Sequence, residues 1–168
     1  KEFIASIKKQ FEQYLLPDKF FIDTFSLERN KSNTYCLFFF TRKILGFKKM
    51  LEAKWQLDED HGKGFKLGKQ MDMFSPTNNM VFSPYPKMLL EYLREKGPVS
   101  NKDLFLFGLN NSYLPKHTKD ALDFLKNVEK VPIEVEPLDG KAAKGYYLNY
   151  ANSIKSGGRK VQIRINSK

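Results

Sequence analysis

The second half of the sequence carries three helical patterns in close succession, and this feature limits the possible folds more than any other. Apolar residues recur three and four positions apart in each pattern, which is the spacing of one face of an α-helix. Gly97-Pro98 closes the first pattern, and Ser100 with Asp103 resembles a capping box at the start of the second. The predicted helices cover Tyr85–Lys96, Ser100–Gly108 and Pro115–Val128.

Short strands are predicted after the third helix. Ile133–Val135 and Gly145–Tyr150 flank a turn at Leu138–Lys144 that contains Asp139-Gly140. Three helices followed by a hairpin is the order of a winged helix-turn-helix domain, which we therefore predict for residues 84–168. Val161–Asn166 alternates apolar and polar residues and predicts a last strand, which pairs either with this hairpin or with one in the first half.

The first half, residues 1–83, predicts a small α-β-β-α unit, so the fold class is α+β. Glu2–Leu16 is an amphipathic helical pattern, and Phe20–Leu27 and Thr34–Phe40 are two strands joined by a polar turn. Apolar residues at helical spacing then predict a helix from Ile44 to about Trp55. Residues 58–68 break this helix, and residues 69–83 show no period and predict an irregular linker.

The charge of the chain favours a polyanionic partner. Twenty-nine Lys and Arg residues against nineteen Asp and Glu residues give a formal charge of +10. A single cysteine, Cys36, cannot form an internal disulfide and is typical of a reducing, cytoplasmic setting. No apolar run approaches the roughly 20 residues needed to span a bilayer, so no membrane segment is expected.

Duplex DNA is the partner that a winged helix with this charge predicts. The third helix of such a domain enters a groove of the DNA with its first residues, and here these carry hydrogen-bond donors. Asp120 and Asp123 on the same helix oppose this function, because carboxylates repel phosphate. The predicted contact residues are Lys116, His117, Thr118 and Lys119 on the helix and Lys141 and Lys144 at the following turn.

A protein-interaction adaptor is the alternative function. In that case the winged helix docks a partner chain through an exposed apolar face and binds no nucleic acid. Phe105, Phe107 and Tyr113 are the candidates for this face. The two hypotheses differ in their dependence on salt, since apolar docking responds little to ionic strength.

No catalytic residues, metal site or cofactor are predicted. The glycines of His61–Gly68 lack the preceding strand and the Gly-Lys-Ser ending of a phosphate loop, and two histidines with one cysteine make no zinc ligand set. Glu52-Ala53-Lys54, with Asp23 or Asp18, invites comparison with the Glu-x-Lys of metal-dependent nucleases. Periodicity instead places Glu52 and Lys54 on a solvated helix face.

The stretch from Tyr35 to Trp55 resembles the three-Cys-motif partner proteins. In that family a strand of the type Tyr-x-Leu-x-Phe-x-Thr leads to a helix that bears Gly, Met, Lys and Trp. The matching positions here are Tyr35, Leu37, Phe39, Thr41, Gly46, Met50, Lys54 or its neighbour, and Trp55.

The resemblance implies the C-terminal half of a methyltransferase-like domain followed by a winged helix. The glycine-rich turn and the acidic residue that hold the adenosyl cofactor in such enzymes are not in this sequence, so no catalytic residues are carried over. We therefore expect a DNA-binding module of a bacterial or phage protein, as part of a methyltransferase-like, DNA-modifying or defence-associated protein.

Overall fold

The computed structural model describes residues 2–15, 20–30, 33–58, 64–66, 83–138, 140, 142–155 and 160–166. The chain divides into two compact units, residues 1–78 and 79–168, and the predicted linker at 69–83 lies outside the described residues except for Ser83. The fold is mixed α+β, in agreement with the predicted class. The elements are α1 (Glu2–Leu15), β1 (Phe21–Asn30), β2 (Asn33–Thr41), α2 (Ile44–Leu57), β3 (Gly64–Lys66), α3 (Tyr85–Lys96), β4 (Val99–Ser100), α4 (Asn101–Asn110), α5 (Pro115–Asn127), β5 (Ile133–Pro137), the π-helical turn η2 (Ala151–Lys155) and β6 (Val161–Ile165).

The first unit contains a three-stranded sheet in the order β2-β1-β3. β1 and β2 form the predicted antiparallel hairpin, in a register that pairs Phe21 with Thr41. β3 then pairs in parallel with β1. The sequence does not predict this third strand, because Gly64–Lys66 has only three residues and no apolar repeat.

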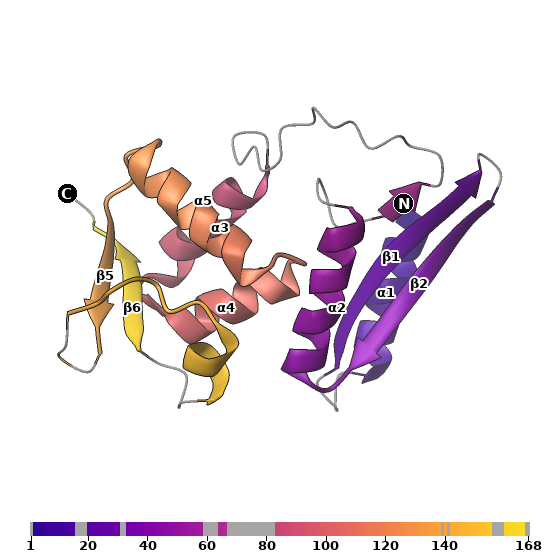
Figure 1. Ribbon diagram of the computed structural model, residues 1–168, viewed down its shortest axis with the longest axis horizontal. Helices are drawn as coiled ribbons and strands as arrows, with labels where there is room; N and C mark the ends of the chain where they lie inside the picture. Colours follow the sequence, from indigo (N-terminus) through magenta and orange to yellow (C-terminus); the bar gives the residue numbers. More distant parts are fainter. Residues whose placement is uncertain are drawn as a thin grey trace. The chain divides into compact units, whose positions relative to one another are not determined.

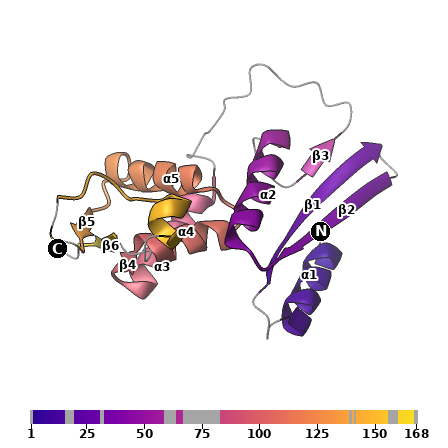
Figure 2. The same cartoon turned by 60° about the horizontal axis from the view of Figure 1, so that its bottom comes forward.

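Helices α1 and α2 lie on opposite faces of this sheet (Figures 1 and 2). On the α1 face, Phe11 makes edge contacts with the rings of Phe38 and Phe40. On the α2 face, Phe21 stacks on Phe47 with 5.2 Å between ring centroids. The core of this unit is made of buried apolar residues from β1 and α2, namely Ile22, Phe25, Phe47, Leu51 and Trp55.

The second unit contains an antiparallel sheet in the order β4-β6-β5. The central strand is β6, which pairs Ile163 with Val99 on one side and with Val135 on the other. The last strand of the sequence therefore joins the second unit rather than the first hairpin.

The predicted strand at Gly145–Tyr150 is wrong, because this segment is irregular and β6 takes the place beside β5. Tyr147 has φ 52°, a left-handed conformation that an extended strand does not accommodate. Tyr146, Tyr147 and Leu148 instead pack their side chains against the hydrophobic core. The sequence pattern thus identified apolar residues correctly and assigned them the wrong backbone conformation.

The three predicted helices of the second unit are confirmed, and they lie to one side of the β5–β6 strands (Figure 1). The capping box is confirmed as well: the Asp103 N–H donates to Ser100 Oγ over 3.2 Å, and the Ser100 N–H donates to Asp103 Oδ2 over 3.3 Å. Within the described part of the chain, no helix has the length and apolar character that crossing a membrane requires. The core combines α3, α4, α5 and the sheet through Leu89, Leu93, Leu104, Leu122 and Ile163.

Candidate nucleic-acid interface

The first turn of α5 carries four of the six predicted DNA-contact residues, and the structure separates them into two pairs. Lys116 and Lys119 are exposed. His117 and Thr118 are buried, with exposed fractions of 2% and 0%. The predicted roles of His117 and Thr118 in DNA contact are therefore wrong, since both side chains point into the core.

His117 organises the start of α5. Its Nδ1 accepts a hydrogen bond from the Leu114 N–H over 3.1 Å, and Leu114 is the residue that precedes the helix. Burial, and secondarily the charge of Lys116, lowers the pKa of His117 to about 4. The imidazole is therefore neutral at pH 7 and serves as an acceptor inside the protein.

Thr118 ties α5 to the other two helices. Its Oγ1 lies 2.7 Å from the hydroxyl oxygen of Tyr85 on α3, within hydrogen-bond distance. Both groups approach Gly108 on α4 so closely that a Cβ built there would lie 2.5 Å from Thr118 Oγ1. Burial raises the pKa of Tyr85, so this phenol stays protonated.

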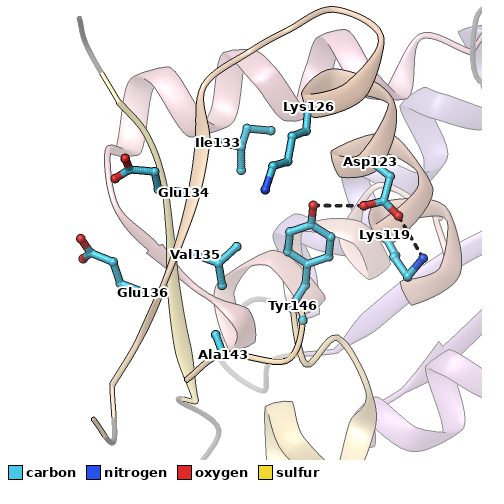
Figure 3. Close-up of a pocket in the computed structure, with 10 residues that line it drawn as sticks. Lys119, Asp123, Lys126, Ile133, Glu134, Val135, Glu136, Ala143 and Tyr146 are labelled. Atoms are coloured by element: carbon cyan, nitrogen blue, oxygen red, sulfur yellow. Dashed lines mark hydrogen bonds and ion pairs between the residues drawn. The ribbon is translucent and has the colours of Figure 1, made fainter. Parts of the chain in front are cut away.

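Lys119 is exposed but not independent, because its Nζ lies 2.9 Å from Asp123 Oδ2 one turn further along α5 (Figure 3). The Tyr146 hydroxyl donates to the other carboxylate oxygen, Oδ1, over 3.1 Å. Burial and the adjacent Asp123 carboxylate raise the pKa of Tyr146 to about 12. Asp123 thus offsets part of the Lys119 charge and anchors the segment after β5 to the helix.

An open groove of about 710 Å³ runs between α5 and β5 beside this contact (Figure 3). Lys119 and Lys126 line it from the helix, and Glu134 and Glu136 line it from the strand. Arg164 on β6 lies 3.0 Å from Glu134 and 2.7 Å from Glu136. In Figure 3 the carboxylates of Glu134 and Glu136 point away from Lys126 and Tyr146, whereas Asp123 lies beside Lys119. The Asp123 carboxylate opposes the binding of a phosphate group there.

The connection from β5 to β6 carries the last two predicted contact residues. Lys144 is exposed, and Lys141 lies outside the described residues. Asn101, which is fully buried at the start of α4, holds this connection in place: its Oδ1 accepts the Lys160 N–H over 2.8 Å and its Nδ2 donates to the Tyr147 carbonyl over 3.3 Å. Sequence reasoning missed Asn101, since it reads as an ordinary first residue of a helix.

The three residues expected to form the apolar face of an adaptor are buried to different degrees. Phe105 is 1% exposed, and Phe107 and Tyr113 pack against the core, where Tyr113 stacks on Tyr85 with 3.9 Å between centroids. Phe105 is therefore not accessible to a partner, while Phe107 and Tyr113 are partly buried and the adaptor function stays a prediction.

The Glu52-Ala53-Lys54 segment of the first unit also differs from expectation. Lys54 is 4% exposed and forms a buried ion pair with Asp23 on β1, so it does not belong to a solvated face. Burial lowers the pKa of Lys54, and the Asp23 carboxylate opposes that shift. Glu52 points elsewhere and pairs with Lys48 and Lys49 on the same helix. The carboxylates of Asp23 and Glu52 therefore do not combine into a metal site.

Comparison with protein-family models, with curated proteins and with solved structures finds no significant match to this chain.

Proposed function

We propose that residues 79–168 form a winged helix that binds duplex DNA through the first turn of α5 and through the connection between β5 and β6. The order of elements supports the fold assignment: a helix, a short strand, two helices and two strands, with the last strand at the centre of the sheet. In a winged helix the third helix enters the groove, and the connection between the last two strands forms the wing.

The observation that carries the proposal is the exposure of Lys116 and Lys119 at the start of the third helix. These ammonium groups can pair with phosphates and release the counterions condensed on DNA. The unit as a whole supports the same partner, because it holds fifteen Lys and Arg residues against nine Asp and Glu residues, a formal charge of +6. Lys141 and Lys144 add positive charge to the proposed wing.

The acidic residues of α5 set where the phosphates bind. Asp123 is held by Lys119 and Tyr146, and Asp120 lies on the turn between Lys116 and Asp123. Carboxylates repel phosphate, so the contacts are concentrated at the Lys116 end of the helix and weaken toward its C-terminus.

The test is the affinity for a fluorescently labelled duplex, measured by anisotropy at several salt concentrations. A variant with Lys116, Lys119 and Lys141 all changed to alanine is expected to bind at least about tenfold more weakly, and the slope of log affinity against log salt should fall by about 3. The matched control changes Lys87, Lys96 and Lys102, on α3 and α4, to alanine and removes the same charge. Equal losses in the two triple variants would show that only net charge matters and would contradict the proposal.

The larger protein that we propose around this module rests on the resemblance to three-Cys-motif partner proteins. It implies a methyltransferase-like domain encoded before Lys1, with a glycine-rich turn after its first strand. Upstream coding sequence tests this point directly, and an unrelated upstream domain would contradict it. The DNA-binding proposal does not depend on that outcome.

A further inference from the structure

Strand β2 presents an open edge of unusual composition. It is an outer strand of the sheet β2-β1-β3, and within the residues that the structure describes only β1 pairs with it. Its nine residues, NTYCLFFFT, include no charge, no proline and no glycine. Natural proteins usually protect such an edge with charged residues, proline or a bulge, since an unprotected edge is a template for another strand.

Apolar side chains extend to this edge on both faces of the sheet. Residues paired in register share a face, so Phe39, opposite Asp23, lies on the α2 side together with Tyr35 and Leu37. Tyr35 and Leu37 are each 54% exposed, so α2 does not cover them. On the α1 side, Phe40 and its ring partner Phe11 are 37% and 38% exposed. The half-exposed side chains therefore continue the hydrophobic layers outward.

We infer that β2 pairs with β2 of a second copy of this chain, antiparallel and about a two-fold axis, so that two three-stranded sheets join into one of six strands. Such an interface is isologous, and the strand must be complementary to itself. With the axis at Leu37, the middle of the strand, Tyr35 of one copy comes opposite Phe39 of the other and Cys36 opposite Phe38. Each of these pairs is apolar or uncharged.

Charge favours a second copy at this edge over other surfaces of the molecule. Two chains of formal charge +10 repel each other wherever their lysines face one another. Asn33–Thr41 brings no like charges into opposition when it pairs with itself, and like charges directly opposite destabilise a strand pair. At this edge, two copies can therefore pair their backbone groups with less charge repulsion than at a surface that carries lysines.

The size of the contact indicates a reversible dimer. Four half-exposed apolar side chains and one strand edge from each copy bury on the order of 1,000 Å² in total, which is at the low end of specific interfaces. We therefore expect a reversible equilibrium between monomer and dimer rather than a permanent dimer.

The test is the molecular mass of the full chain by sedimentation equilibrium, at concentrations from about 1 to about 200 µM. The parent chain should pass from monomer to dimer, and Leu37→Lys should remain monomeric throughout. The matched control is Leu57→Lys on α2, since Leu57 is 55% exposed and gains the same charge. It should dimerise like the parent.

Two further measurements test whether Leu37→Lys is still folded and whether β2 is the strand that forms the interface. Circular dichroism should show the same helix and strand content for Leu37→Lys as for the parent, because the substituted side chain is half exposed. Hydrogen exchange of the β2 amides should slow as the parent concentration rises. A parent that stays monomeric at 200 µM, or equal dimerisation of the two lysine variants, would overturn the inference.

Discussion

The two units bury polar groups in different ways. The first unit buries a charged pair, Asp23 on β1 and Lys54 on α2. The buried polar residues of the second unit in the described ranges carry no formal charge, and they are Ser100, Asn101, His117, Thr118 and Ser153. Desolvating a charge costs far more than desolvating an amide or a hydroxyl, so the first unit depends on one contact and the second on several smaller ones.

The two kinds of buried contact respond differently to substitution. A buried ion pair fixes the position of one element against the other, but removing either partner leaves an uncompensated buried charge. A neutral hydrogen bond contributes less than a charged one, so a single change to it is expected to cost less than the loss of one partner of the ion pair. Three tests separate these two kinds of buried contact.

The largest effect is expected from Lys54→Met. It leaves the Asp23 carboxylate buried and unpaired, and the free energy of unfolding should fall by about 3–5 kcal/mol. The double variant Asp23→Asn with Lys54→Met removes both charges, while the new amide oxygen can still accept the Thr24 N–H that Asp23 Oδ1 accepts over 2.8 Å. Urea denaturation should show that the double variant recovers most of the loss. If the single and double variants were equally unstable, lost packing rather than an unpaired charge would explain the loss of stability.

An intermediate effect is expected from pH, through His117. Its pKa is about 4 in the folded protein and about 6.5 when unfolded, so the unfolded state binds more protons between these values. The resulting stability is fully present above pH 6.5 and is lost as the pH falls through 4, by about 2–3 kcal/mol. In His117→Asn this contribution to the pH slope should vanish. Thermal unfolding of residues 79–168 from pH 7.5 to 4 measures it, and an unchanged slope in the variant would contradict the assignment.

The smallest effect is expected from Gly108→Ala, which tests crowding around Thr118 and Tyr85. The new methyl group would lie 2.5 Å from Thr118 Oγ1 and 3.1 Å from the Tyr85 hydroxyl, so the three-helix contact must shift at a cost of about 1–3 kcal/mol. Gly46→Ala in α2 is the control, because its methyl group would meet Thr41 Oγ1 at 3.3 Å and helix propensity favours alanine. Near-equal stabilities of the two variants would show that the second unit is not tightly packed here.

Sequence reasoning predicted the helices better than the strands, and the cause is the length of each pattern. The Tyr85–Lys96 helix was predicted with its observed bounds, because four apolar residues and a Gly-Pro stop all agree. β3 has three residues and no apolar repeat, so it carries no such signal. Tyr146 and Tyr147 fit a strand by composition, yet a left-handed residue at Tyr147 prevents it.

The candidate site was predicted in part, since helical position alone does not tell which polar residue is buried. Lys116 and Lys119 lie on the surface as expected, whereas His117 and Thr118 are buried, and Thr118 contacts Tyr85 on α3. A periodicity argument over the apolar residues Ala121, Leu122 and Leu125 would have placed Thr118 and His117 on the inner face, one turn earlier. No comparable pattern predicts that Lys54 is buried, because its partner Asp23 is remote in the sequence.

The order β4-β6-β5 has a consequence for how the second unit folds during synthesis. Ile163 pairs with both Val99 and Val135, so the middle of the sheet is the part that a ribosome makes last. Until residues 161–165 emerge, β4 and β5 have no strand between them, and the apolar faces of α3, α4 and α5 lack the strand they cover. β6 pairs with strands that are made much earlier, so this pairing forms late. We therefore expect the nascent unit to expose hydrophobic surface until β6 inserts between β4 and β5.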